Sequence, residues 1–331
     1  MRVDGAAYAS GARHRVVRYP SGTGTKEMSE MARIGVVGAG RVGAVLSAAL
    51  RAAGHEVVAA AGESAASRER IAALLPGVPV GKPTDVARAC DLLLLTVPDD
   101  MLDNVATTLV GAGAIRPGQV VVHTSGRHGL AALHAVAELG ARPVALHPAM
   151  TFTGTSVDLP RLPGCVFGMT AGDGERELAE SLVADLGGVV MWVAEERRAL
   201  YHAGLAHGAN HLVTLVSQAM DLLAAAGADD PAATLRPLLT AALDNALERG
   251  NDALTGPIVR GDVRTVQAHL RDLVETSPAT VPSYVAMARA TADRAMLDGR
   301  LLPIRASRIA GLLDEALRAV GQDARAHHPS R

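Results

Sequence analysis

Short apolar runs alternate with helical patterns between residues 33 and 193. The apolar runs predict strands at Ile34–Val37, Glu56–Ala61, Asp91–Val97, Gln119–His123, Pro143–Leu146, Cys165–Thr170 and Val189–Val193. Helical spacing predicts helices at Val42–Ala53, Ala65–Leu75, Asp99–Val110, Leu130–Leu139 and Glu175–Leu186. Because strands that alternate with helices form parallel sheets covered on both faces, the pattern predicts an α/β fold with a doubly wound, mostly parallel sheet.

Beyond Glu195 the pattern becomes entirely helical. Helical spacing continues from Glu195 to Ala226, and further helices are predicted at Asp230–Glu248, Asp262–Glu275, Pro282–Leu297 and Ile304–Val320. We therefore expect a sheet domain over residues 32–194 and a helical domain over residues 195–322. Residues 1–31 contain arginines but no apolar run, which is typical of a disordered extension and not of a secretory signal. Met28 and Met31 are alternative start sites within this extension.

A glycine-rich turn joins the first predicted strand to the first predicted helix. Its sequence is Gly38-Ala39-Gly40-Arg41-Val42-Gly43, a G-x-G-x-x-G motif in the strand–turn–helix context of a dinucleotide fingerprint. Gly38 would form the tight turn, Gly40 would admit the pyrophosphate, and Gly43 would let the helix pack closely. The alternative is a plain strand-to-helix turn. We expect all six residues to contact a dinucleotide at the helix N-terminus.

The end of the second strand bears on which dinucleotide binds. An NAD site commonly ends this strand with an acidic residue that holds the ribose 2′-hydroxyl, but the strand ends here in Ala61 and Gly62. Ser64, Ser67 and Arg68 follow, and hydroxyls with a guanidinium suit a 2′-phosphate. This favours NADP. Two alternatives remain: Ser64 caps the next helix, and the neighbouring Glu63 serves as the ribose acid.

Ligands of doubly wound sheets lie beyond the carboxyl ends of the strands. Val97 and Pro98 end a dense apolar strand at that edge, so their position predicts a wall of the nicotinamide pocket. Asp99 follows them, and we expect it to cap the next helix.

Two histidine-bearing segments follow strands at the same predicted edge. They are His123-Thr124-Ser125-Gly126 and His147-Pro148. Ser125 and His147 are candidates to hold a substrate carbonyl or carboxylate. A hydrogen-bonded structural role is the alternative for each histidine.

The long predicted helix also carries polar groups. On a regular α-helix His202 and Asn210 lie about 80° apart on one side, separated by small residues that would leave room for a ligand. His207 and His211 form an i, i+4 pair. The chain offers no H-E-x-x-H arrangement and no evident third ligand, so we expect packing or interface roles for this pair and no metal site.

A turn at Gly256-Pro257 separates two predicted helices further on, and Asp262 suits the N-cap of the second one. Capping does not account for Arg260 or Thr255, which could reach an anionic substrate. Lysine occurs only at Lys26 and Lys82, which excludes mechanisms that need a lysine in the C-terminal two-thirds.

The composition bears on whether the protein binds nucleic acid or membranes. A net charge of −2 and an aromatic content of 2% give no basis for binding nucleic acid or an anionic membrane surface. No apolar run is long enough to span a bilayer. Cys90 and Cys165 lie in apolar runs and are interpreted as buried thiols in a reducing compartment, so we expect a cytoplasmic protein.

These segments together resemble a bacterial family of Rossmann-like oxidoreductases whose C-terminal half is known only as a domain of unknown function. The matching pieces are the fingerprint, the segments at His123 and His147, Tyr201-His202, Asn210, and residues 254–262. More distantly, the layout is similar to ketopantoate reductase, pyrroline-5-carboxylate reductase and the 6-phosphogluconate dehydrogenase group. The resemblance implies a nicotinamide cofactor, usually NADP, and a homodimer formed through the helical half. Ketopantoate reductases and hydroxyacid dehydrogenases carry a catalytic lysine near the start of the long helix, where this chain has His202.

We therefore expect an NADPH-dependent oxidoreductase that transfers hydride to a small carbonyl or imine substrate, with 2-oxo acids such as ketopantoate as first candidates. His202 would protonate the substrate, because an imidazole titrates near neutral pH. Asn210 and Ser125 would orient the carbonyl, with His147 beside them, and Arg260 would hold a carboxylate. The alternatives are a regulator or scaffold that binds NADP(H) without catalysis and, less favoured, a methyltransferase that uses the glycine turn for S-adenosylmethionine.

Overall fold

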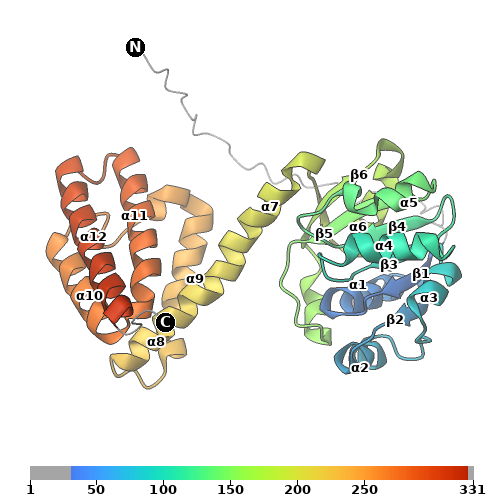
Figure 1. The fold of residues 1–331 in the computed structure, drawn as a ribbon, viewed down its shortest axis with the longest axis horizontal. Coiled ribbons are helices and arrows are strands. Elements are labelled where there is room, and N and C mark those ends of the chain that lie inside the picture. Colours follow the sequence, from blue (N-terminus) through green and yellow to red (C-terminus); the bar gives the residue numbers. More distant parts are fainter. Residues whose placement is uncertain (1–30, 327–331) are drawn as a thin grey trace, which may run out of the picture. The chain divides into compact units, whose positions relative to one another are not determined.

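A computed structural model describes residues 31–326 of the chain (Figure 1). The chain divides into two compact units, the first ending at Ala203 and the second beginning at Gly204. Of the predicted extension at residues 1–31, only Met31 is among the described residues.

The first unit is built on a seven-stranded sheet in the order β2-β1-β3-β4-β5-β6-β7. The strands are β1 (Arg33–Val37), β2 (Glu56–Ala61), β3 (Leu92–Leu95), β4 (Val120–His123), β5 (Arg142–Pro148), β6 (Val166–Ala171) and β7 (Val189–Trp192). All neighbouring strands are parallel except β5 and β6, which run antiparallel. The predicted fold class, a mostly parallel sheet followed by an all-helical region, is confirmed.

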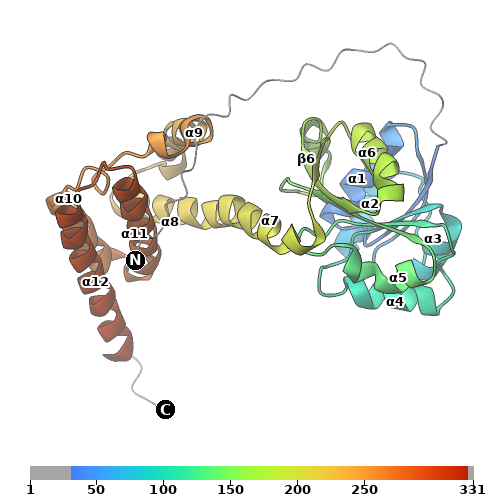
Figure 2. The ribbon, with the colours of Figure 1, turned by 90° about the horizontal axis from the view of Figure 1, so that it is seen from above.

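Helices cover both faces of this sheet (Figure 2). One face carries α1 (Arg41–Ala52), α2 (Ala65–Leu74) and α6 (Arg176–Asp185), and the other carries α3 (Pro83–Ala89), α4 (Leu102–Gly111) and α5 (His134–Glu138). The all-leucine strand β3 shows why its run is continuously apolar. Leu92 and Leu94 point into one hydrophobic cluster, whereas Leu93 and Leu95 point into the other, so every residue is buried.

The second unit is helical. Its elements are the end of α7 (Arg198–Leu205), a π-helical segment (Ala206–Asn210), α8 (His211–Ala225), α9 (Pro231–Arg249), α10 (Val263–Thr276), α11 (Val281–Leu297) and α12 (Pro303–Ala326). Its core lies among α10, α11 and α12. In contrast, α8 contributes no fully buried residue and α9 contributes only Leu235. Among residues 31–326, no helix combines the length and the apolar character needed to cross a membrane.

Several local predictions were wrong. His147 and Pro148 lie inside β5, because antiparallel pairing with β6 extends the strand to Pro148. Helix α4 begins at Leu102 without a side-chain cap, and Asp99 instead lies 3.7 Å from Arg127 in an ion pair. Both cysteines are free thiols, but Cys165 is only partly buried.

The long predicted helix also differs from expectation at one point. The π-helical turns at Ala206–Asn210 change the angular step per residue. The angle expected between His202 and Asn210 on a regular α-helix therefore does not apply.

Candidate active site at the carboxyl edge of the sheet

The strand order reverses at β1, which has β2 on one side and β3 on the other. Ligands of such sheets bind beyond the carboxyl ends of the strands at this switch point. The fingerprint follows β1, Thr96 and Val97 follow β3, and the segment containing Ser125 follows β4. His147 lies near the end of β5, so these predicted site residues share one edge.

Gly38 occupies a position that requires glycine. Its φ is +91°, a region that residues with a side chain rarely adopt. A Cβ atom there would also lie 2.7–2.8 Å from the backbone of Thr96 and Val97 at the end of β3. The Thr96 hydroxyl donates a hydrogen bond of 2.7 Å to the Gly38 carbonyl. The first turn of the fingerprint is thus pressed against the neighbouring strand.

The rest of the fingerprint brings an open main chain to the start of a helix. Gly43 packs against the Thr96 side chain, which lets α1 approach the sheet closely. A Cβ on Gly40 would meet only the Gly38 carbonyl oxygen, at 3.8 Å, and would otherwise enter open space. The amides of Arg41, Val42 and Gly43 are the first of α1 and have no partner within the helix. Open space beside unpaired amides fits a dinucleotide pyrophosphate.

The hydroxyls after β2 take part in a local network at the start of α2. The Ser64 side chain caps the helix by accepting from the Ser67 amide at 3.1 Å, and the Ser67 hydroxyl donates to the Ser64 carbonyl at 2.8 Å. Ser67 is buried, whereas Ser64 is exposed. The exposed Arg68 donates to the Glu63 carbonyl at 2.8 Å and pairs with no carboxylate among residues 31–322. Its guanidinium therefore keeps donors available beside the end of β2.

His147 and His202 meet around Gly126. The two imidazole rings lie edge to face, with centroids 5.8 Å apart. A Cβ atom on Gly126 would lie 2.9 Å from Nε2 of His147 and 2.5 Å from Cδ2 of His202. The main chain after β4 therefore lies directly against both rings, and only glycine leaves them room.

Tyr201 sets the orientation of His147. Its hydroxyl lies 3.0 Å from Nδ1 of His147, and its ring covers Gly168, the residue opposite His147 on β6. Burial raises the pKa of Tyr201, so the hydroxyl keeps its proton at neutral pH. We assign this proton as the one donated to Nδ1, which leaves the imidazole proton on Nε2, the atom nearest Gly126.

Burial is the main cause that lowers the pKa of His147 to about 4, and positive charge on His202 and Arg198 acts in the same direction. His147 is therefore neutral at physiological pH. A neutral imidazole in this tautomer is a hydrogen-bond donor through Nε2, and it is not a source of a full positive charge.

His123 has a structural role instead. Its Nε2 donates to the Gly129 carbonyl at 2.9 Å, and its Nδ1 accepts from the Ser125 amide at 3.2 Å. Burial lowers its pKa to about 4. The Ser125 hydroxyl accepts from the His128 amide at 3.2 Å, so these bonds fix the turn that carries Gly126.

Arg198 anchors the start of α7 to the sheet. It is completely buried and donates to the Ser125 carbonyl at 2.6 Å, the Thr170 hydroxyl at 3.0 Å and the Gly168 carbonyl at 3.4 Å. Among residues 31–322 no carboxylate pairs with it. Because Tyr201 follows within one helical turn, these bonds fix it over the end of β5.

Glu195 provides a second anchor for the same segment. Its carboxylate accepts from the amides of Leu130 at 2.8 Å and Ala131 at 3.1 Å. Gly129 lies so close to this carboxylate that a side chain there would overlap it. Neither Arg198 nor Glu195 stands out as a site residue in the sequence, because both belong to a charged run, Glu195-Glu196-Arg197-Arg198, that is typical of an exposed helix start.

The remaining predicted residues lie apart from this cluster along the chain. Val97 is partly buried and Pro98 is exposed after β3. Asn210 is exposed at the end of the π-helical segment, and Arg260 lines a separate cavity of the second unit. His207 and His211 are exposed with their Nδ1 atoms 3.0 Å apart. The described residues contain no group of three or more metal-ligating side chains placed to hold an ion.

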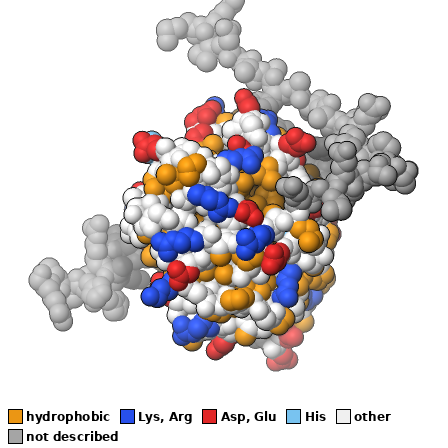
Figure 3. Space-filling model, turned by 90° about the vertical axis from the view of Figure 1, so that its right-hand side faces the viewer, with side chains coloured by type: hydrophobic (Ala, Val, Ile, Leu, Met, Phe, Trp, Pro, Cys, Tyr) orange, Lys and Arg blue, Asp and Glu red, His pale blue; other side chains and the backbone are white. Residues whose placement is uncertain are grey.

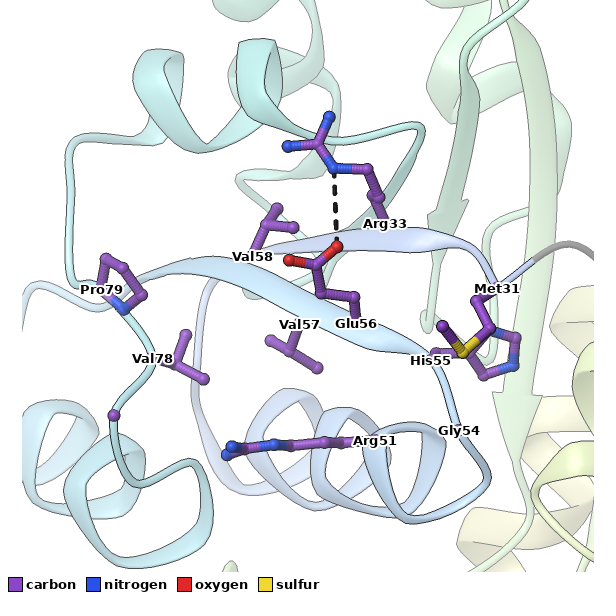
Figure 4. Close-up of a pocket in the computed structure, with 11 residues that line it drawn as sticks. Met31, Arg33, Arg51, Gly54, His55, Glu56, Val57, Val58, Val78 and Pro79 are labelled. Atoms are coloured by element: carbon purple, nitrogen blue, oxygen red, sulfur yellow. Dashed lines mark ion pairs between the residues drawn. The ribbon is translucent and has the colours of Figure 1, made fainter.

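A cavity of about 580 Å³ opens at the opposite end of the sheet, where β1 and β2 begin (Figure 4). Its charged groups are already engaged. Arg33 lies 3.7 Å from Glu56, and Arg51 donates to the Pro76 carbonyl at 3.0 Å. We assign no ligand to it. On the face drawn in Figure 3, basic and acidic side chains are interspersed among apolar ones.

Comparison with known families matches two regions of the chain, and the second begins inside the sheet unit, at the start of β6. Residues 20–148 match a Rossmann-like domain, and residues 165–291 match a domain of unknown function, DUF2520. The chain combines a Rossmann-like domain with a DUF2520 domain. The comparison with curated proteins found no match.

Solved structures with the same fold include reductases. A putative NADP oxidoreductase from Bacteroides fragilis is 20% identical with a TM-score of 0.67, over 79% of this chain and 98% of that one. A protein from Thermotoga maritima is 20% identical with a TM-score of 0.59, over 80% and 99%. Pyrroline carboxylate reductase from Plasmodium falciparum, a structure with NADP bound, is 12% identical with a TM-score of 0.51, over 85% and 98%. At these identities the likeness shows a shared fold.

Proposed function

We propose that the protein is an NADPH-dependent reductase of a small carbonyl or imine compound, with 2-oxo acids as the first class to test. The observation that carries the proposal is the pair His147 and His202 against Gly126, at the strand edge that bears the fingerprint. From β1 to β4 the sheet advances two strand spacings, about 10 Å. That separation suits a dinucleotide whose pyrophosphate lies at the fingerprint and whose nicotinamide extends toward Gly126.

The cofactor would be held by the turn from Gly38 to Gly43, with Val97 and Pro98 beside the nicotinamide. When bound, it supplies the hydride. Ser64, Ser67 and Arg68 would bind the 2′-phosphate. Support for NADP comes from the donors that Arg68 keeps free.

His147 and His202 would divide the work at the substrate. His147, neutral and held by Tyr201, would donate a hydrogen bond from Nε2 to the carbonyl oxygen or imine nitrogen. Such a donor stabilises charge that develops on that atom without giving up a proton. His202 would deliver the proton as general acid.

Ser125 would position the substrate in the sheet unit. Its side chain is buried at the turn that carries Gly126, and its hydroxyl would orient the carbonyl group. Asn210 and Arg260 belong to the second unit, and their contact with the substrate stays a prediction from the sequence.

The test is NADPH consumption across a panel of oxo acids and cyclic imines. On the substrate found, His202→Ala should lower kcat by about 10² to 10⁴ while NADPH still binds. Gly126→Ala places a methyl group against both imidazoles and should lower kcat/KM roughly 10²-fold, since small misplacements at the reacting centre are costly. Gly172→Ala is the matched control, because a Cβ there meets nothing within 4 Å.

Two outcomes would contradict the proposal. Tight NADPH binding without turnover of any panel member would indicate a regulator that senses the cofactor. Thermal stabilisation by S-adenosylmethionine, and by neither NADPH nor NADH, would indicate a methyltransferase, because a ligand stabilises the folded state that binds it.

We also propose that the protein acts as a homodimer. Helix α8 packs against α9, yet both leave apolar side chains exposed, namely Leu212, Val213, Leu215, Leu238, Leu243 and Leu247. Monomeric proteins rarely leave large apolar patches in water. A second copy of the chain would cover these side chains.

A further inference from the structure

A second cavity, in the helical unit, is lined by four arginines. It has a volume of about 490 Å³ and is formed by two segments. Residues 260–264 contribute Arg260 and Arg264 at the start of α10, and α12 contributes Arg305 and Arg308. The two α12 arginines are three residues apart, so they lie on the same side of that helix.

Within the described part of the chain, the four guanidiniums lack acidic partners. None of them forms an ion pair with a carboxylate among residues 31–322, whereas other arginines of this unit do. Asp262 is the one acidic residue of the lining. The cavity therefore carries a formal charge of +3, four arginines less one aspartate, within a small volume.

Asp262 is committed to helix α10. Its carboxylate accepts from the Thr265 amide at 3.2 Å and from the Thr265 hydroxyl at 2.7 Å. Those bonds are the main cause that lowers its pKa, and Arg264 and Arg260 add to the effect. Because the Asp262 carboxylate already caps the N-terminus of α10, an anion in the cavity would be bound by the arginine side chains.

Arg305 is held in place by the loop before α10. Gly261 has a φ of +65°, and a Cβ there would lie 2.6 Å from Cδ of Arg305. The aliphatic part of Arg305 thus packs on Gly261, while its guanidinium donates to the Arg260 and Gly261 carbonyls at 3.4 and 3.3 Å. Ile258 and Val259 are buried and fix the same loop in the core.

We propose that this cavity binds a small molecule bearing a diphosphate or a comparably charged phosphate group. Guanidinium forks that approach from two segments match the several acceptor oxygens of phosphoryl groups. A single carboxylate would leave most of the positive charge unbalanced, so the proposal extends the role of Arg260 to a multiply charged ligand. It concerns binding alone and stands whether or not the protein transfers a hydride.

The experiment is calorimetric titration of the full chain with inorganic pyrophosphate at low salt, since salt screens exposed charges. The double variant Arg264→Gln/Arg308→Gln should weaken binding about 100-fold, on the order of tenfold for each charged hydrogen-bonding group removed. Arg271→Gln is the matched control, because this exposed α10 arginine already pairs with Asp272. It should change the affinity less than twofold.

Further arms distinguish this cavity from the fingerprint and from non-specific attraction of anions. Pyrophosphate binding that is kept in the double variant would assign the anion to another site, such as the main-chain amides of the fingerprint, and overturn the proposal. Citrate or a single-stranded oligonucleotide that binds as tightly as pyrophosphate would show recognition of charge alone, and it would overturn the phosphate assignment. Absence of pyrophosphate binding to the unaltered chain would overturn it as well.

Discussion

His123 is buried, His147 is partly buried, and both are neutral imidazoles, so acidification should weaken the sheet unit. Burial lowers the pKa of each to about 4, from an ordinary value of 6.5. Because the folded-state pKa is the lower one, the stabilising effect is complete above pH 6.5 and is lost as the pH falls from 6.5 toward 4. The unfolded state binds more protons throughout that window.

The size of the effect follows from the shift. A difference of about 2.5 pKa units corresponds to roughly 3.4 kcal/mol of unfolding free energy for each histidine once the pH is below 4. At pH 5 the two histidines together should already have lost about 4 kcal/mol relative to pH 8. Between these pH values the free energy of unfolding should fall by up to about 2.7 kcal/mol per pH unit.

Trp192 allows this to be measured on the sheet unit itself. It is the chain's single tryptophan, it lies in β7, and it packs against the core with Arg176 over its ring. Urea unfolding followed by its fluorescence at pH 8, 7, 6 and 5 gives the slope. His147→Gln should remove about half of the slope, whatever its effect on absolute stability. The exposed His134→Gln should leave the slope unchanged, and a slope that is the same in all three proteins would refute the buried neutral assignment.

Three other substitutions test the fingerprint, the cofactor and the dimer. Gly38→Ala should lower the free energy of unfolding in urea by about 2–5 kcal/mol, because the strain of a positive φ adds to the overlap with Thr96. Gly54→Ala is the control: its φ is +108° but its Cβ would enter open space, so the loss should be about 1–2 kcal/mol. Equal losses would contradict the contact with β3. Arg68→Gln should weaken NADPH binding roughly 10- to 100-fold and leave NADH binding unchanged in fluorescence titrations, and a parallel loss for both would exclude a 2′-phosphate contact. Val213→Glu should convert a dimer to a monomer in sedimentation velocity. If the unaltered chain already sediments as a monomer, the proposed dimer is wrong.

The central strands β1, β3 and β4 could be predicted from the sequence because nearly all of their residues are buried, which makes them continuously apolar. The predicted strand Glu56–Ala61 has the observed bounds. Helix α3 (Pro83–Ala89) was not predicted, since seven residues are too few to show a helical period. The π-helical turns at Ala206–Asn210 were not predictable either, because the same residues fit regular α-helical spacing.

The candidate site divides in the same way. Gly126 and His147 could be brought to one edge by sequence alone, since parallel strands end together. The contact of His147 with Tyr201 could not, because it depends on where α7 leaves the sheet. The burial of Arg198 could not be predicted from the sequence, because its hydrogen-bond partners are two main-chain carbonyls and a hydroxyl that lie far away along the chain.

The boundary between the two units falls inside helix α7, after Ala203. This boundary restricts which fragments and chimeras of the protein can fold. A fragment that stopped at the last strand, at Trp192, would lack Arg198 and leave the acceptors on Ser125, Gly168 and Thr170 unpaired in the core. Exchange of helical halves between related chains would succeed only where the incoming helix brings an equivalent arginine. The first turns of α7 thus belong to the sheet unit, and any fragment or chimera that contains this unit must include them.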